Sequence, residues 1–236
     1  MAKGYSSVLV ISDLHAPWQH PDALEFLKAI KKEIKPQFIL NVGDECDAHA
    51  LSMHDSDPDL PSAGDELKLA RAVMHDLEKI FPKMTLLHSN HSSLIYRRAL
   101  KHGMPRAYLR NYNEFLQVGP GWKWVDDLTF KLSDGSKVFA THGMAADGLK
   151  LSMQMGCHTI QGHFHSKAAI NYFSNPSQLV WSLQVGCLTK QSSLAFQYAR
   201  NFKMRFIIST GAIINGQPVL YPMQLNDNGR WTGELV

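Results

Sequence analysis

Apolar residues in the first half of the chain form short continuous runs that alternate with segments of helical period. Three runs have the length of buried strands: Val8–Ser12, Phe38–Val42 and Met84–His88. Three segments carry apolar residues at helical spacing: 22–34, 66–81 and 92–102. Because strands and helices alternate in this way, the pattern predicts right-handed βαβ units around a buried parallel sheet.

The second half is dominated by strand patterns. Two short apolar segments flank Asp134-Gly135, a turn pair typical of a β-hairpin. These segments and the later predicted strands are Leu128–Leu132, Lys137–Thr141, Thr159–Gln161, Ala168–Phe173, Leu179–Val185, Met204–Thr210 and Pro218–Tyr221, with one helix over Ala145–Met155. Residues 52–65 predict an irregular loop, whereas 104–125 show no clear period. We therefore expect an α/β fold in which a two-sheet β-sandwich is flanked by helices.

Composition is consistent with one domain over residues 1–236. The chain is 44% apolar, enough for a substantial core. Its formal net charge of +3 is a mild excess without a block of basic residues. This balance is compatible with an anionic substrate, but it differs from the basic tail of a nucleic-acid-binding protein.

Cysteine usage and hydropathy predict a cytoplasmic protein without a membrane segment. The three cysteines, Cys46, Cys157 and Cys187, form no CxxC pair, which fits a reducing compartment. The N-terminal residues lack a signal-peptide pattern. No apolar segment approaches the roughly 20 residues that span a bilayer.

Polar motifs follow five of the predicted strands. In chain order they are Asp13-x-His15, Gly43-Asp44-x-x-Asp47, Asn90-His91, His142-Gly143 and Gly162-His163-x-His165. Each motif is weak alone, since short loops and helix caps use the same residue types. Together they place Asp, Asn and His groups where open α/β sheets bind ligands, at one edge of a sheet.

These groups are sufficient for two adjacent divalent cations. In such centres the metals lie about 3.5–4 Å apart, neutralise the phosphoryl oxygens and hold the attacking hydroxide between them. A carboxylate that bridges both metals keeps them close together. Mixed oxygen and nitrogen donors favour Mn²⁺, with Fe, Zn²⁺ or Ni²⁺ as alternatives, over Ca²⁺. The pattern thus predicts hydrolysis of a phosphate ester.

The five motifs, in this order, resemble those of the calcineurin-like metallophosphoesterase family. The resemblance spans Asp13 to His165, about two thirds of the chain, and is similar to the compact enzymes of phages and bacteria. Two positions depart from the family pattern: Ser89 stands where the family has glycine, and Ser92 where it has an acidic residue. Neither departure changes an expected metal ligand.

The resemblance implies a role for each matching residue. One metal would be held by Asp13, His15 and His165, the other by Asn90, His142 and His163, with Asp44 as the bridge. His91 would be the general acid, and Asp47 would orient it and favour its imidazolium form. Arg97 and Arg98 are candidates for contact with a substrate phosphate, although a solvated helix face is the simpler interpretation.

The expected activity is that of a phosphatase or phosphodiesterase acting on a phosphomonoester or phosphodiester: a small phosphoester, a nucleotide or a phosphoprotein. A DNA or RNA nuclease is the first alternative, but backbone binding needs several clustered Lys or Arg residues. The second is a catalytically impaired binding or regulatory module on the same fold, which only Ser89 and Ser92 support.

Overall fold

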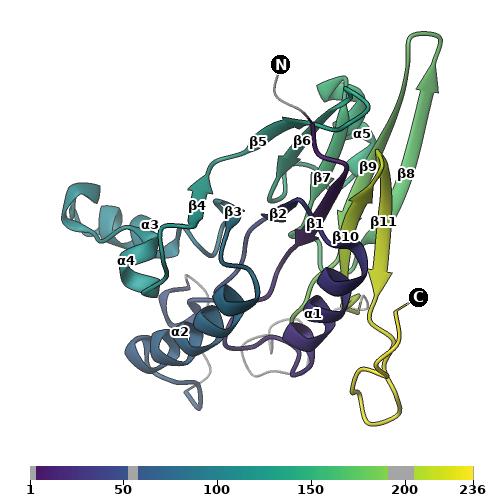
Figure 1. The fold of residues 1–236 in the computed structure, drawn as a ribbon. Coiled ribbons are helices and arrows are strands. Elements are labelled where there is room, and N and C mark those ends of the chain that lie inside the picture. Colours follow the sequence, from purple (N-terminus) through teal and green to yellow (C-terminus); the bar gives the residue numbers. More distant parts are fainter. Residues whose placement is uncertain (1–3, 53–57, 191–204, 236) are drawn as a thin grey trace.

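The computed structural model describes residues 4–52, 58–190 and 205–235, which form two mixed β-sheets with flanking helices (Figure 1). The strands of the six-stranded sheet are, in spatial order, β11 (Gln217–Pro222), β10 (Ser209–Ile214), β1 (Ser7–Ile11), β2 (Phe38–Asn41), β3 (Met84–Leu87) and β4 (Trp122–Val125). Those of the five-stranded sheet are β5 (Leu128–Lys131), β6 (Lys137–Thr141), β7 (His158–Gln161), β9 (Gln178–Val185) and β8 (Ala168–Asn175). The predicted fold class is confirmed.

Each sheet has parallel strands at its centre. Strands β1 to β4 run parallel, and β10 and β11 extend that sheet as an antiparallel pair. In the other sheet β6, β7 and β9 are parallel, whereas β5 and β8 are antiparallel edge strands. Within each sheet, the carboxyl ends of the parallel strands therefore lie at the same edge, as the sequence pattern predicted.

The helices cover the outer faces of the sheets. Helices α1 (Ala23–Ile34) and α2 (Ala63–Ile80) pack on the six-stranded sheet, and α5 (Gly148–Met155) packs on the five-stranded one (Figure 1). The remaining helical elements are α3 (Leu94–Lys101), α4 (Tyr112–Leu116), η1 (His49–Leu51) and η2 (Arg106–Tyr108). Among the described residues, none of the helices combines the length and apolar character that a membrane span requires.

Strand β1 illustrates how one apolar run serves two cores. Alternate side chains of a strand point to opposite faces, so Leu9 and Ile11 pack among the helices while Val8 and Val10 face the second sheet. All four are fully buried. This two-sided burial explains why the run is continuous rather than alternating.

The strand predicted over Met204–Thr210 lies further along the chain. Met204 is outside the described residues, and β10 begins only at Ser209 and continues to Ile214. A two-residue turn at Asn215-Gly216, both with positive φ, joins it to β11. Asn-Gly is the preferred pair for such a hairpin, so this turn sets the position of the strand.

Two helices begin at residues other than those predicted, because capping side chains set their first turns. Helix α2 begins at Ala63 rather than Glu66, because the Ser62 hydroxyl accepts the Asp65 N–H. Helix α5 begins after Asp147, whose carboxylate caps the Lys150 N–H, and not at Ala145. The segment 104–125, left undecided by its pattern, contains η2, α4 and β4.

The interface between the sheets should dominate stability. Leu183 in β9 is fully buried between them, whereas Leu179 in the same strand is 58% exposed. We expect Leu183→Ala to lower the free energy of unfolding by about 2–5 kcal/mol, and Leu179→Ala to change it by less than about 0.5 kcal/mol. Denaturant unfolding of both variants measures this, and equal losses would contradict the assigned core.

Candidate metal centre

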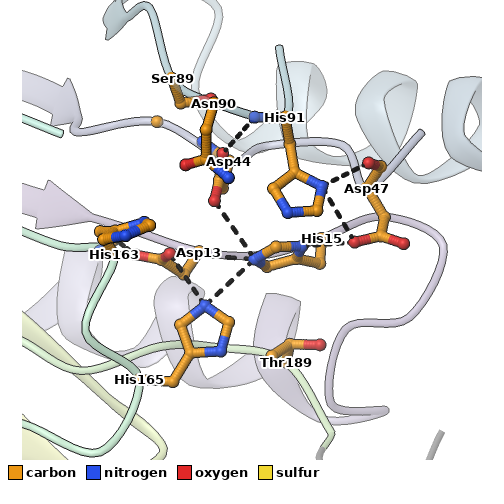
Figure 2. A network of polar contacts seen from close by, with 12 residues as sticks. Asp13, His15, Asp44, Asp47, Ser89, Asn90, His91, His163, His165 and Thr189 are labelled. Atoms are coloured by element: carbon orange, nitrogen blue, oxygen red, sulfur yellow. Dashed lines mark hydrogen bonds and ion pairs between the residues drawn. The ribbon is translucent and has the colours of Figure 1, made fainter. Parts of the chain in front are cut away.

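The loops that follow β1, β2, β3, β6 and β7 meet at one place between the two sheets. Figure 2 shows Asp13, His15, Asp44, His163 and His165 pointing toward one another there. All seven predicted metal ligands lie in these loops: Asp13, His15, Asp44, Asn90, His142, His163 and His165. Residues separated by up to 152 positions in sequence are thus in direct contact.

The first group of candidate ligands consists of Asp13, His15, Asp44 and His165. Each offers an atom within 4.8 Å of the others. The two imidazole Nε2 atoms lie 3.2 Å apart, and His165 Nε2 lies 3.0 Å from Asp13 Oδ1. His15 Nε2 is also 3.5 Å from Asp44 Oδ2. Carboxylate oxygens and imidazole nitrogens that converge in this way form a donor set suited to a divalent transition metal.

The second group consists of Asp44, His142 and His163, again with atoms within 4.8 Å of one another. His142 Nε2 lies 3.2 Å from Asp44 Oδ2 and 2.8 Å from the side-chain oxygen of Asn90. Asn90 therefore approaches this group through an atom that could also bind a metal. Asp44 belongs to both groups, which is the position that a bridging ligand would need.

Two buried histidines of the site, His15 and His142, are oriented by hydrogen bonds at Nδ1. His142 Nδ1 donates to the carbonyl of Val42 at 2.8 Å, and His15 Nδ1 lies 2.6 Å from Asp47 Oδ1. With Nδ1 engaged, each ring presents Nε2 to the carboxylates of the site. Hydrogen bonds of this kind fix the tautomer of metal-binding histidines and make them stronger ligands.

The Asp47 carboxylate therefore lies closer to His15 than to His91, the residue that Asp47 was expected to orient. Its carboxylate is 3.3 Å from His91 Nδ1, and its backbone carbonyl accepts from the same nitrogen at 2.5 Å. The backbone N–H of His91 donates to Asp44 Oδ1 at 3.1 Å. His91 thus lies over His15, between Asp44 and Asp47 (Figure 2). Sequence reasoning missed the contact between Asp47 and His15.

The backbone around the site is strained. Asp13, His15, Asp44 and His163 all have φ between 49° and 67°, in the left-handed region. Such a conformation costs about 1–3 kcal/mol for a non-glycine residue and persists only where surrounding contacts enforce it. Four of the seven predicted ligands therefore depend on the packing around them.

Two glycines allow the loops to approach closely. A Cβ on Gly43, which has φ of 112°, would lie 2.7 Å from both His142 Nδ1 and Ser89 Cβ. A Cβ on Gly162 would lie 1.8 Å from Ser12 Oγ and 2.4 Å from Asp13 Oδ2. The glycines of the Gly-Asp and Gly-His motifs are thus needed because the two sheets meet at these points.

The serines that depart from the family pattern form a hydrogen-bonded pair. Ser89 has no positive φ, and its hydroxyl accepts the Asp44 N–H at 3.0 Å. Ser92 Oγ accepts the Ser89 N–H at 2.8 Å, and the two hydroxyls are 3.0 Å apart. Ser89 therefore supports the backbone of Asp44, and it occupies a conformation that does not require glycine.

The two arginines that were candidates for contact with a substrate phosphate have different surroundings. Arg98 donates through Nε to the Leu51 carbonyl at 2.7 Å and also donates to the Ser52 carbonyl, so it fastens η1 to α3. Arg97 is exposed and donates to the Asn90 carbonyl at 2.7 Å. This hydrogen bond places Arg97 next to the Asn90 loop, at the edge of the site.

Buried carboxylates and imidazoles determine the electrostatics. Burial opposes protonation of His15, but Asp13 and Asp47 outweigh it and raise its pKa to about 10. Burial likewise opposes protonation of His142, yet Asp44 raises its pKa to about 9. Despite burial, the neighbouring histidines hold the pKa of Asp13 and of Asp44 well below the ordinary value. Protons on the histidines thus balance the carboxylates, a task that metal cations could also perform.

A profile of the calcineurin-like phosphoesterase family matches residues 6–181. Among solved structures, vacuolar protein sorting 29 (Vps29) from Cryptosporidium parvum is similar, with a TM-score of 0.52 and 17% identity over 99% of this chain and 96% of that chain. YfcE, a phosphoesterase from E. coli, gives 0.48 and 12% over 98% of both chains. Entamoeba histolytica Vps29 complexed with Zn²⁺ gives 0.49 and 15% over 94% and 93%. No curated protein matches the sequence. The likeness to Cryptosporidium Vps29 shows the fold alone.

Metal binding should depend on pH. Because the pKa of His15 is about 10 and that of His142 about 9, both rings carry an extra proton near neutrality. A metal binds only after each Nε2 has lost its proton. We expect the affinity for Mn²⁺ to rise from about pH 6 to about pH 9, by about tenfold per unit for each proton displaced. Calorimetry in buffers of different ionisation enthalpy counts those protons; an affinity independent of pH would contradict this assignment.

Proposed function

The chain belongs to the calcineurin-like phosphoesterase family, and on this basis we propose that it hydrolyses phosphomonoesters or phosphodiesters at a centre of two divalent metal ions. Three groups of side chains among the described residues could hold a metal: Asp13, His15, Asp44 and His165; Asp44, His142 and His163; and His15, Asp47 and His91. The observation that carries the proposal is the position of Asp44, the one carboxylate that lies in two of these groups. A carboxylate placed between two such groups supports a pair of adjacent metals better than it supports two independent sites.

In this proposal each metal has its own ligands. Asp13, His15 and His165 would hold one, Asn90, His142 and His163 the other, and Asp44 both. The mixed oxygen and nitrogen donors favour Mn²⁺, with Fe, Zn²⁺ or Ni²⁺ as alternatives. When bound, the pair would supply Lewis acidity toward the phosphoryl oxygens and a water nucleophile that is activated near neutral pH.

His91 would donate the proton that the leaving oxygen requires. Its Nδ1 faces the Asp47 carbonyl, which can only accept a hydrogen bond, so Nδ1 carries a proton and Nε2 is left for the substrate. The Asp47 carboxylate also lies 3.3 Å from Nδ1 and helps to hold the ring in this orientation. Nε2–H would then pass its proton to the departing alkoxide, and Nδ1 would retain its own.

The substrate we favour is a small phosphoester, a nucleotide or a phosphorylated side chain. A nuclease would need several lysines or arginines in a continuous groove, and Arg98 is already used to hold η1. A binding module of the same fold is the alternative of another class. The retention of carboxylates, imidazoles and their orienting hydrogen bonds at one place favours turnover.

Removing His91 should separate chemistry from metal binding. It contacts Asp44 and Asp47, and it forms a third group with His15 and Asp47, but it lies outside the two groups that share Asp44. We expect His91→Ala to retain two metals per chain and to lower kcat by about 10²- to 10⁴-fold, with the smaller loss for aryl esters that leave without protonation. Elemental analysis together with a Mn²⁺ assay of alkyl esters, aryl esters, cyclic nucleotides and single-stranded DNA measures both quantities.

Asp44→Asn is the variant to compare with His91→Ala, because it changes a proposed metal ligand. We expect it to weaken binding of both metals and to abolish hydrolysis, with circular dichroism unchanged. Near-normal turnover in Asp44→Asn would place the bridge elsewhere. A wild-type protein that binds two metals but hydrolyses no ester of the panel would favour the binding module, and efficient cleavage of DNA alone would favour the nuclease.

A further inference from the structure

An apolar cavity of about 340 Å³ lies directly behind His91. Helices α2, α3 and α4 and the short η1 contribute its walls, which include Leu51, Leu67, Ile95 and Phe115. An engineered apolar cavity of about 150 Å³ is enough to bind benzene, and ligand pockets begin at about 300 Å³. This cavity is therefore large enough for one or two fused rings.

The described side chains that line the cavity offer no permanent cation to an anionic occupant. No lysine or arginine is among the described residues that line it, and the ionisable side chains include two carboxyls, Glu45 and Glu66. Both oxygens of Glu66 accept backbone N–H groups, those of His49 and Ala50. Glu45 Oε1 accepts from Trp124 Nε1, and its Oε2 has no hydrogen-bond partner among the described residues. A phosphate group would find no permanently cationic partner among these side chains, whereas an uncharged ring needs none.

His91 connects this cavity to the metal centre. One side of the residue lines the cavity, while its N–H donates to Asp44 Oδ1 and its ring packs edge-on against His15, with 4.6 Å between ring centroids. Ser92, which supports the Asp44 loop through Ser89, lines the cavity as well. His91, the residue that we assign as the general acid, therefore borders both spaces.

We propose that this cavity binds the uncharged, apolar ring of the leaving alcohol, an inference that rests on the proposed function. A general acid must lie within hydrogen-bond reach of the leaving oxygen. The group carried by that oxygen then extends past His91, away from the metals and toward the cavity. The phosphoryl group stays with Asp13, Asp44 and the histidines, and the apolar part of the substrate is removed from water.

The test compares phosphate monoesters of methanol, benzyl alcohol and naphthylmethanol, whose alcohols are of similar acidity, so that the chemistry of the leaving oxygen is nearly constant. We expect kcat/KM to be about 10- to 100-fold higher for the ring esters than for methyl phosphate, as burial of an apolar group in a fitted pocket provides. Wild-type protein that hydrolyses all three equally would overturn the cavity assignment and leave the proposed function intact. Loss of all turnover in metal-loaded protein would overturn both.

Gly64→Phe places a large ring at the solvent-exposed end of the cavity, away from the centre. Gly64 lines the cavity in the first turn of α2, and a Cβ there would meet no atom closer than Ser62 Oγ at 4.0 Å. Replacing glycine in a helix also favours folding. We expect this variant to lose the preference for ring esters while methyl phosphate turnover is unchanged. Leu67→Trp, which enlarges another lining residue, should have the same effect.

Leu69→Phe is the matched control, because Leu69 lies on the same helix but is 49% exposed and does not line the cavity. It should retain the full preference for ring esters. A preference that persists in both Gly64→Phe and Leu67→Trp would show that the ring binds elsewhere and would overturn the proposal.

Discussion

The Asp44 carboxylate is the point on which the two halves of the site depend. It follows β2 of the six-stranded sheet, yet its Oδ2 lies 3.5 Å from His15 of the same sheet and 3.2 Å from His142 of the other. Its Oδ1 accepts the N–H of His91. A buried carboxylate is costly unless it is paired, and here every partner comes from a different loop. The contacts of the Asp44 side chain therefore depend on the relative position of the two sheets.

The backbone adopts strained conformations to support this arrangement. Left-handed conformations at Asp13, His15 and Asp44 direct their side chains inward, and Gly43 and Gly162 allow the opposing loops to approach. The strain is balanced by the packing of two apolar cores, one on each face of the six-stranded sheet. Rigid strands with strained loops at their ends are a common arrangement for sites that must hold ligands in fixed geometry.

Much of the fold and of the candidate site could be predicted from the sequence, because apolar runs and polar motifs alternate in a pattern that parallel strands require. The predicted ligands lie close together in the structure, and their roles as ligands and their division between two metals remain predictions. The contact between Asp47 and His15, and the support that Ser89 gives to Asp44, could not be predicted, since both depend on the side-chain orientations that the folded loops adopt and no motif specifies these. The position of β10 could have been found from Asn215-Gly216.

The central claim is that Asp44 joins two metals into one centre, and electron paramagnetic resonance of the Mn²⁺-loaded protein tests it most directly. Two ions bridged by Asp44 should be exchange-coupled and give a multiline spectrum with reduced hyperfine splitting. In Asp44→Asn that spectrum should be lost. A six-line signal of isolated ions in the fully loaded wild-type protein, unchanged in Asp44→Asn, would contradict the account.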